Sequence, residues 1–378
     1  MQKQRIQKIL SMAGVASRRE AELLILQKRV KVNGVVACSN QKQQDDAKAV
    51  LENQRWLSNI WNTVSAEKNA MTLTQYNSAI KQFDTLVDSQ SDVFDLTKVK
   101  VENEKVKISN TDNGKSIPVV FMDIDETILN NYAYQNWLVL HKQSFSSKTW
   151  DEFVKAKISK KLAGAFEFIE HVWKKGGVVF FNSNREQENQ LEPTKQNLIA
   201  QGLPAKYLEK WVWWMQGVDL SKDKPWMHIK KENDKRVKTE KEERMNLVNS
   251  KKLDLSGDNQ VGANNVSFKV VMRVGDNFDD FNDIASVNKS NKERNDVLKE
   301  IGPLFGNFSK EVKGIKYTKT KGIIKKENES WAEGYVLIGG NSSYGGFEKG
   351  LDKNYYKLSK EDQVKALKNA FNEWKWKD

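Results

Sequence analysis

Three short apolar runs, each followed by polar residues, stand out along the chain. They cover residues 117–122, 178–181 and 268–274, and patterns with helical spacing lie between them. Buried apolar strands that alternate with helices are typical of a parallel α/β sheet. Ligands of such sheets bind at the carboxyl ends of the strands, where these polar residues fall. The pattern therefore predicts an α/β fold whose site lies at the strand ends.

A separate small unit is predicted before this sheet. Apolar residues at helical spacing indicate two helices, and Ser17 and Glu20 form a capping box at the start of the second. Asn33 and Gly34 then provide the preferred turn of a short hairpin. We expect residues 1–37 to form this helix–helix–hairpin unit.

The same unit is strongly basic. Residues 1–37 contain eight Lys or Arg residues and two Glu residues, a net charge of +6 within a total of +12 for the chain. A local excess of this kind indicates a polyanionic partner such as RNA, or an anionic membrane face. A solvated helical surface has a similar composition and stays an alternative.

The unit resembles the small RNA-binding module at the front of bacterial pseudouridine synthases. Residues 6–10, 13–22 and 29–34 carry the resemblance. The module is cut off after its first hairpin, and the Gly-Arg-Leu-Asp signature of those synthases does not occur in the sequence. The resemblance implies RNA contact through residues 1–37, without pseudouridine synthesis.

The end of this module allows a second interpretation. Val-Val-Ala-Cys at 35–38 and the polar residues after it resemble the cleavage site of a bacterial lipoprotein, with Cys38 as the lipidated residue. Such a site needs an apolar stretch of about 7–15 residues before it, and the basic residues at 28–31 interrupt that stretch. We interpret the arrangement as a fusion or a misassigned start, and a chance match is the alternative. Residues 38–46 are expected to form a linker.

Cysteine and histidine usage excludes several kinds of chemistry. Cys38 is the single cysteine, so neither an internal disulfide nor a Cys-based zinc site can form. The three histidines lie far apart in the sequence and lack metal-ligand spacing. No run of about 18 apolar residues is present, so the sequence predicts no membrane span.

The polar residues after the three apolar runs suggest phosphoryl transfer. Asp123 and Asp125 follow the first run. One carboxylate can attack phosphorus, and the other can protonate the leaving oxygen and later deprotonate water. Ser183 follows the second run and offers a hydroxyl to a phosphoryl oxygen. Asp276 follows the third run and offers an oxygen ligand to Mg²⁺.

The order and spacing of these groups resemble the haloacid dehalogenase phosphatase superfamily, specifically its class C acid phosphatases, the bacterial lipoprotein 5′-nucleotidases. The resemblance covers about residues 62–356. It implies a parallel sheet flanked by helices in a domain over 47–378, with a small, mostly helical cap formed by about 47–110 and inserted segments. Its most specific segments are 122–129, 181–185, 274–281 and 344–351.

The resemblance also implies an activity. The chain would hydrolyse nucleoside 5′-monophosphates and other phosphomonoesters with Mg²⁺, through an aspartyl-phosphate. Asp123 would be the nucleophile and a metal ligand, and Asp125 the general acid/base and a ligand through its backbone carbonyl. Ser183 would bind phosphate, Asp276 would complete the protein ligands of the metal, and Asp280 would support them.

A lysine is also required, because the phosphoryl group and the nucleophile need a positive charge. The family has Lys-x-x-Arg about one helix before the third strand, and Lys241 with Arg244 matches this pattern. We assign the role to Lys241. Lys238 is the competing candidate in this lysine-rich region.

Substrate contacts are expected from two further groups of residues. Asn184 and Arg185 follow the second apolar run and are expected to bind the substrate. In the family that the chain resembles, aromatic side chains of the cap stack on a nucleobase, and the resemblance implies this role for Tyr134 and Tyr344. Such stacking tolerates any base, since every base has a π-face. Trp137 and Phe347 either stack on the base or pack within the protein. A third group of aromatic residues could form the wall of a binding site, but we expect it to pack in the core. The group consists of Trp211, Trp213 and Trp214.

Two functions of other classes stay open from the sequence. The chain could be an RNA-binding protein with a phosphatase-like body, or a non-catalytic surface lipoprotein that keeps the fold for binding. The family resemblance implies an extracytoplasmic, membrane-anchored lipoprotein. The missing apolar segment instead implies a cytoplasmic protein if the N-terminus is as written.

Overall fold

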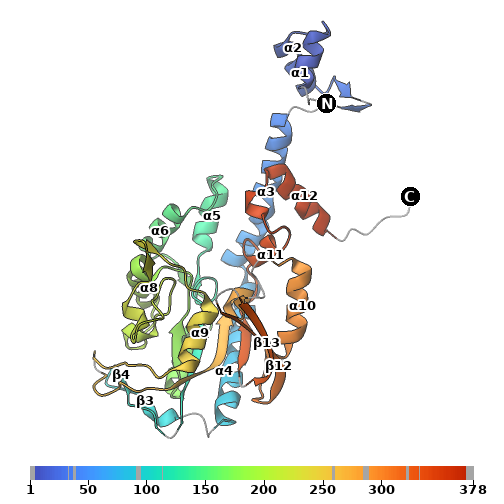
Figure 1. The fold of residues 1–378 in the computed structure, drawn as a ribbon. Coiled ribbons are helices and arrows are strands. Elements are labelled where there is room, and N and C mark those ends of the chain that lie inside the picture. The colour runs from blue at the N-terminus through green and yellow to red at the C-terminus, as the bar shows by residue number, and fades with distance from the viewer. Residues whose placement is uncertain are drawn as a thin grey trace. The chain divides into compact units, whose positions relative to one another are not determined.

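The computed structural model forms two compact units (Figure 1). The smaller unit comprises residues 1–56 and 354–378, and the larger comprises 57–353. The structure describes most residues of both units. The described ranges are 5–32, 34–36, 40–90, 95–112, 114–257, 260–283, 289–320, 323–331 and 333–371.

The smaller unit contains the predicted helix–helix–hairpin arrangement. It comprises α1 (Ile6–Met12), α2 (Arg18–Leu26) and the antiparallel strands β1 (Lys31–Val32) and β2 (Val35–Val36). The predicted capping box is present: Glu20 N–H donates to Ser17 Oγ (3.2 Å) and Ser17 N–H to the Glu20 carboxylate (2.9 Å). This unit also contains η8 (Tyr355–Lys357) and α12 (Lys360–Ala370). Asn33 of the predicted turn and Cys38 lie outside the described residues.

The predicted linker differs from the structure. Residues from Asn40 onward belong to α3 (Asn40–Val64), and the division between the two units falls within this helix, after Trp56. The segment 40–46 lacks Gly and Pro, and its residues can continue a helix whose later turns carry apolar residues. The predicted domain limits at residues 37 and 46 stay predictions.

The larger unit is built on a parallel sheet. Among the described residues its strand order is β14-β11-β5-β8, and each neighbouring pair is parallel. The three apolar runs form β5 (Ile117–Met122), β8 (Val178–Phe181) and β11 (Phe268–Gly275), as predicted. The edge strand β14 (Gly334–Leu337) was not predicted, because it is short and includes a glycine. The fold class is therefore confirmed.

Helices pack against this sheet. The buried side of α4 (Ala66–Asp88) includes Tyr76, Ala79 and Phe83, which join the main apolar core of the sheet. This corrects the expectation that residues 47–110 belong to the cap: α4 has enough apolar surface to lie against the sheet itself. Trp211, Trp213 and Trp214 are buried in the same core, so their expected packing role is confirmed. The other helices are α7 (Ala165–Lys174), α8 (Gln187–Ala200), α9 (Lys241–Ser250), α10 (Asn291–Ile301) and α11 (Gly346–Lys349).

A small helical lobe is inserted after β5. It consists of α5 (Tyr132–Leu140) and α6 (Ser147–Ala156), and it has its own apolar cluster around Tyr134, Leu138 and Phe153. This lobe corresponds to the inserted part of the predicted cap. The remaining strands are β3 (Val99–Glu102), β4 (Lys105–Ile108), β6 (Leu129–Asn130), β7 (Lys160–Lys161), β9 (Lys231–Glu232), β10 (Lys235–Arg236), β12 (Val312–Thr320) and β13 (Ile323–Trp331). The 3₁₀ helices of the larger unit are η1 (Leu96–Lys98), η2 (Ala205–Tyr207), η3 (Lys210–Val212), η4 (Pro225–Met227), η5 (Phe278–Asp280) and η7 (Gly302–Leu304).

Candidate active site

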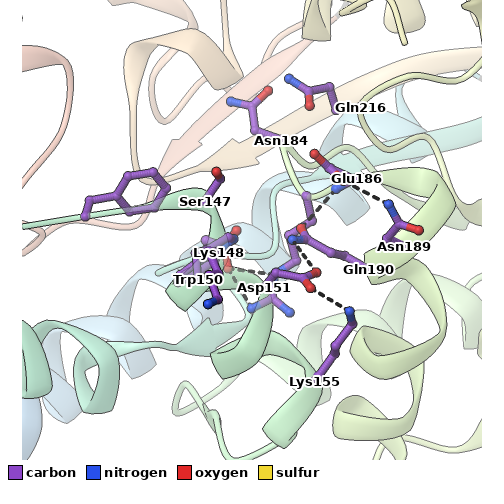
Figure 2. A pocket seen from close by; sticks show the side chains of 13 residues that line it. Ser147, Lys148, Trp150, Asp151, Lys155, Asn184, Glu186, Asn189, Gln190 and Gln216 are labelled. Carbon is purple, nitrogen blue, oxygen red and sulfur yellow. Dashed lines mark hydrogen bonds and ion pairs between the residues drawn. The ribbon is translucent and has the colours of Figure 1, made fainter. Parts of the chain in front are cut away.

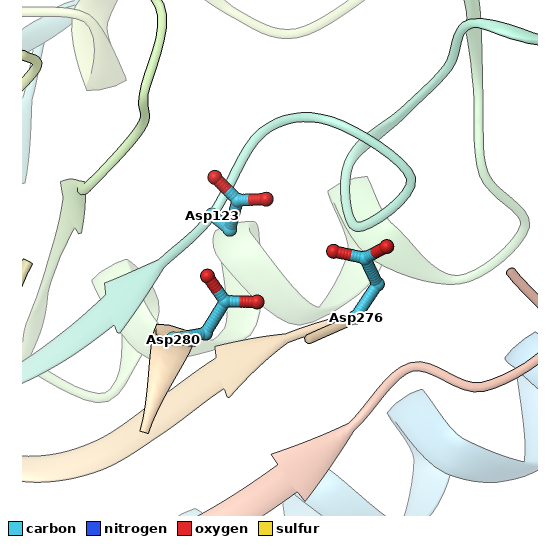
Figure 3. Close-up of side chains that lie close together, drawn as sticks. All are labelled: Asp123, Asp276 and Asp280. Carbon is cyan, nitrogen blue, oxygen red and sulfur yellow. The ribbon is translucent and has the colours of Figure 1, made fainter. Parts of the chain in front are cut away.

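The candidate site lies where β5, β8 and β11 end. Backbone hydrogen bonds of the sheet continue beyond these strands: Asp123 N–H donates to Val274 O (2.9 Å) and Asn182 N–H to Met122 O (2.7 Å). The sheet thereby fixes the backbone of Asp123 and of the residue before Ser183. The carboxylates predicted from separate strand ends meet here, as Figure 3 shows for Asp123, Asp276 and Asp280.

These three carboxylates form the acidic cluster. Each offers an oxygen, and the three oxygens lie within 4.8 Å of one another among the described residues. Burial, followed by the charges of Asp280 and Asp123, raises the pKa of Asp276 well above its usual range. Oxygen-rich clusters of this kind suit Mg²⁺, whose charge would offset the repulsion between the carboxylates. The residues present therefore fit a divalent cation.

Lys241 is the cation that the structure itself provides. Its Nζ donates to Asp123 Oδ1 and to Asp280 Oδ1, at 2.6 Å in each case, and its side chain is 4% exposed. Burial disfavours the ammonium, but the two carboxylates outweigh this effect and raise the pKa of Lys241. The competing candidate Lys238 is half exposed and pairs with Glu240. The geometry therefore favours Lys241 over Lys238.

The nucleophile candidate combines opposing influences. Burial raises the pKa of Asp123 to about 7; Lys241 opposes this shift, and the charges of Asp280 and Asp125 add to it. Because the ammonium is in hydrogen-bond contact, deprotonation of Asp123 leaves an ion pair rather than an isolated buried charge. A charged, oriented carboxylate at a strand end can attack an electrophile that enters the cluster.

Arg185, the predicted substrate contact, lines a cavity beside Asp125 and also contacts protein groups. Its guanidinium is 1% exposed, and its Nε donates to Asp125 Oδ1 (2.9 Å). Its other donors reach Thr194 Oγ1 (2.9 Å) and Asn131 Oδ1 (3.1 Å), and Asn131 Nδ2 also donates to Asp125 Oδ1 (2.7 Å). Arg185 thus holds the side chain of Asp125 from the protein side through a hydrogen bond from its guanidinium.

A cavity of about 660 Å³ lies beside Asp125 (Figure 2). Asn184 is exposed and lines it, so the position of Asn184 agrees with its predicted substrate contact. The aromatic rings of Phe145 and Trp150 and the amide of Gln216 also line the cavity. The cavity beside Asp125 is therefore lined by both aromatic and polar side chains.

Tyr134, which was expected to stack on a nucleobase, is packed inside the helical lobe instead. It is 2% exposed, its hydroxyl shares a hydrogen bond with Thr149 Oγ1 (2.8 Å), and its ring packs against Trp137 and Trp150 inside the helical lobe. Its ring fills the apolar interior that α5 and α6 need in order to pack together. Among the neighbouring aromatics, Phe145 is 63% exposed and could meet a ligand.

Ser183 and Tyr344 lie at the site with polar partners. Ser183 is fully buried at the end of β8, and its Oγ accepts a hydrogen bond from Arg185 N–H (3.1 Å). Tyr344 donates its hydroxyl hydrogen to the carboxylate of Glu126. Phe347 is 39% exposed rather than part of the core.

Several residues of the site were missed from the sequence. Glu126 is buried, and burial followed by the charge of Asp125 raises its pKa to about 8. Glu126 directly follows Asp125 in the sequence, and this position could have indicated that it belongs to the site. Asn131 and Asn341 hold Asp125 and Asp276, but a single asparagine in a loop gives no pattern that sequence analysis could use.

Comparisons with known proteins agree with this geometry. A family model described as HAD superfamily, subfamily IIIB (Acid phosphatase) matches residues 33–306. The chain belongs to this acid phosphatase family. As an acid phosphatase it is a phosphoric monoester hydrolase, and the predicted enzyme class is confirmed.

Solved structures support the fold of this acid phosphatase. It is similar to the class C acid phosphatase from Bacillus anthracis, with a TM-score of 0.57 and 20% identity over 86% of this chain and 99% of that one. The same Bacillus anthracis enzyme with tungstate bound gives a TM-score of 0.58, with the same identity and coverage.

A second family model, the S4 domain, matches residues 4–41 of the acid phosphatase. S4 is an RNA-binding domain, so the predicted resemblance of the N-terminal unit is confirmed. The match extends through β1 and β2 and includes Cys38. No described helix of the enzyme is both long enough and apolar enough to cross a membrane.

Proposed function

We propose that this acid phosphatase hydrolyses nucleoside 5′-monophosphates with Mg²⁺, through an aspartyl-phosphate on Asp123. The observation that carries the proposal is the contact of Lys241 with Asp123 and Asp280, next to the carboxylate of Asp276. A nucleophile, a fixed cation and metal-compatible oxygens are thereby gathered at one strand end.

The chain's own residues account for the two half-reactions. An Asp123 carboxylate oxygen attacks phosphorus, the bond between phosphorus and the ester oxygen breaks, and Asp125 gives its proton to the leaving oxygen. Asp125 then takes a proton from water as the water attacks the aspartyl-phosphate, which releases inorganic phosphate and restores Asp123. Arg185 and Asn131 hold Asp125 in position through both steps.

Asp123, Asp276 and the backbone carbonyl of Asp125 are the proposed metal ligands, with Asp280 supporting them. A bound Mg²⁺ supplies positive charge that orients and polarises the phosphoryl oxygens. Ser183 and Lys241 are the proposed protein contacts of the same phosphoryl group.

The substrate class is supported by the cavity beside Asp125. Its volume of about 660 Å³ leaves room for a nucleoside as leaving group, and Phe145 offers an exposed ring for a base. Asn184 and Gln216 offer hydrogen bonds to the polar part of a nucleoside. Tyr344 is the second proposed stacking residue.

Phosphate release tests the proposal. We expect turnover of a nucleoside 5′-monophosphate with Mg²⁺, loss of turnover with chelator, and loss in Asp123→Asn. Asp223→Asn is the matched control, because Asp223 is an exposed aspartate that only approaches Lys251 at 4.0 Å. Turnover that persists in Asp123→Asn would contradict the aspartyl-phosphate mechanism.

RNA contact through the S4 domain is a second proposed function. The observations in its favour are the S4 match and the exposed Arg18, Arg19, Lys28 and Arg29 of this unit. Phosphate contacts make such affinity strongly salt-dependent. We expect the double substitution Arg18→Glu and Arg19→Glu to weaken RNA binding at least tenfold at low salt and to leave phosphatase activity unchanged. Equal RNA affinity of both proteins would contradict the proposal.

For localisation, we propose an extracytoplasmic enzyme anchored to the membrane through Cys38, as the family resemblance implies. Lipidation at Cys38 requires removal of residues 1–37, and hence of most of the range matched by the S4 domain. Anchoring and RNA contact are therefore alternatives for any one molecule. The mass of the native amino-terminal peptide distinguishes them: a lipidated Cys38 supports anchoring, and a retained S4 unit supports a cytoplasmic protein.

A further inference from the structure

The acidic cluster depends on a loop that is distant in sequence. Residues 339–345 follow β14, and Asn341 Nδ2 donates to Asp276 Oδ2 (2.7 Å). Asn341 Oδ1 in turn accepts from the Tyr132 hydroxyl (3.0 Å). We call residues 339–345 the support loop. Its position determines where Asn341 can hold the carboxylate of Asp276.

The support loop is held by side chains of α3. Asn62 Nδ2 donates to Gly340 O (2.9 Å), and Ser343 Oγ donates to Asn59 Oδ1 (2.5 Å). Ser58 Oγ shares hydrogen bonds with Ser343 Oγ (2.7 Å) and with Ser342 Oγ (2.8 Å). Three residues within about one turn of the helix, Ser58, Asn59 and Asn62, thus contact three residues of the loop, Gly340, Ser342 and Ser343.

Asn62 also reaches the other side of the site. Its backbone carbonyl accepts a hydrogen bond from Asn130 Nδ2 (2.9 Å). Asn130 immediately precedes Asn131, which holds Asp125. Asn62 therefore contacts both the loop that supports Asp276 and the segment that supports Asp125.

These contacts are buried, which makes them costly unless they are well formed. Asn59, Asn62 and Ser343 are each at most 3% exposed. Burial of an amide or hydroxyl stabilises a fold less than burial of an apolar group of the same size, so tight packing alone does not account for three such groups together. The hydrogen bonds of these three residues instead fix the position of the support loop. Gly340 and Gly345 of this loop have positive φ angles of 100° and 135°.

Close packing leaves the loop little freedom. A Cβ atom at Gly340 would lie 2.8 Å from the ring of Trp61 and 2.9 Å from Met71 Cε. Next to it, Gly339 O accepts from the buried Lys68 Nζ (2.6 Å). The backbone of the loop is thereby seated directly on α3 and α4.

We propose that Ser58, Asn59 and Asn62 of α3 are positioning residues of the active site, which act through the support loop and Asn341 on Asp276. The proposal rests on the proposed metal-dependent function. Partners of metal ligands typically change metal affinity or activity by about 10–100-fold when removed. The residues of α3 contact Asp276 only through the support loop. We therefore expect their removal to change metal affinity and activity by about tenfold, the lower end of this range.

The test uses full-length protein and Mn²⁺ as the probe, with free Mn²⁺ measured by electron paramagnetic resonance. Asn62→Leu removes the donor to Gly340 and keeps the side-chain volume. We expect its Mn²⁺ dissociation constant to rise about tenfold and kcat to fall about tenfold, with KM within about twofold. Asn53→Leu is the control, since Asn53 is exposed on the same helix. All measurements are made below the melting temperature of every variant, so that a loss of stability alone does not produce these changes.

Two further comparisons keep the proposal testable if Asn62→Leu fails to fold. Ser58→Ala should weaken Mn²⁺ binding, and Ser58→Thr, which keeps the hydroxyl, should restore it. Asn341→Ala should weaken binding at least as much, and adding Ser58→Ala to it should cause little further loss, because both act along one chain of contacts.

The outcomes distinguish a failure of the proposed role of α3 from a failure of the proposed metal site. Wild-type Mn²⁺ affinity in both Asn62→Leu and Ser58→Ala would overturn the role of α3 while leaving the metal site intact. Fully additive losses in the variants with Asn341→Ala would also overturn it. Absence of Mn²⁺ binding by the wild-type protein would overturn the metal site itself, and the role of α3 with it.

Discussion

Lys241 and Asp123 form a buried ion pair, with 2.6 Å between Nζ and Oδ1. The lysine is placed by the first turn of α9 and the aspartate by the end of β5, so two separate elements of the fold define the pair. Because Asp280 contacts the same ammonium, Lys241 is the shared neutralising charge of the acidic cluster.

Replacement of Lys241 by Met should abolish most of the activity. The ammonium is lost while the side-chain length is kept, so the phosphoryl charge and two carboxylates lose their partner. Loss of one preorganised electrostatic contact typically lowers kcat by about 10²–10³-fold. We also expect the variant to unfold at lower urea concentration, since two buried carboxylates are left unpaired. Lys238→Met is the matched control, and an equal effect of the two substitutions would reassign the role.

Replacement of Asp276 by Asn should stabilise the metal-free protein. In the wild type, burial and neighbouring carboxylates disfavour the ionised form of Asp276, as the raised pKa indicates. The neutral amide removes that repulsion, so we expect a higher melting temperature in chelator. Added Mg²⁺ should then stabilise the wild type but not the variant, because binding to the folded state is what shifts the melting temperature. A variant that is less stable in chelator would show that Asp276 is not repelled by its neighbours.

Replacement of Arg185 by Gln should lower kcat rather than raise KM. The guanidinium of Arg185 donates to Asp125, Thr194 and Asn131. We therefore expect the substitution to act on catalysis by disturbing the orientation of Asp125. We expect a fall in kcat of about 10–100-fold, typical of a general acid that has lost its orientation. Lys148→Gln gives the opposite comparison, because exposed Lys148 lines the cavity and should affect KM first. A large rise in KM with unchanged kcat in Arg185→Gln would restore the substrate-contact role.

Stability should fall as the pH rises because of Asp283. Burial, then the charges of Glu242 and Glu240, raise the pKa of Asp283 from 3.8 to about 8. A carboxyl group whose pKa is raised in the folded state binds its proton more tightly there than in the unfolded chain. Its contribution is therefore complete below pH 3.8 and is lost progressively up to about pH 8. We expect Asp283→Asn to be more stable than the wild type at pH 9 by a larger margin than at pH 5, measured by urea unfolding at both pH values. An equal margin at the two values would contradict the raised pKa.

The strand ends were predictable because each follows a short apolar run that is typical of a buried strand, and patterns with helical spacing lie between the runs. Asp123, Ser183 and Asp276 come from such positions, and parallel strands must present them at one edge. Lys241 was proposed because it matches the Lys-x-x-Arg pattern of the family that the sequence resembles. The structure places this lysine, rather than Lys238, against Asp123.

For Tyr134 and Arg185, the sequence alone could not distinguish a contact with a ligand from a contact within the protein. Both residue types suit a ligand as well as a protein partner, and only three-dimensional packing distinguishes the two. Tyr134 fills the interior of the α5–α6 lobe, and Arg185 is enclosed with Asp125. The contact of Asn62 with Gly340 joins residues 278 positions apart, and that of Asn341 with Asp276 joins residues 65 positions apart. No periodicity in the sequence predicts either contact.

The backbone hydrogen bonds that continue from the sheet into the site have a consequence for hydrogen exchange. The amides of Asp123 and Asn182 donate to carbonyls of neighbouring strands, Val274 and Met122. Their hydrogens can exchange with deuterium only when these central strands separate, which requires an opening close to global unfolding. We therefore expect the amide of Asp123, the proposed nucleophile, to be among the slowest-exchanging amides of the enzyme.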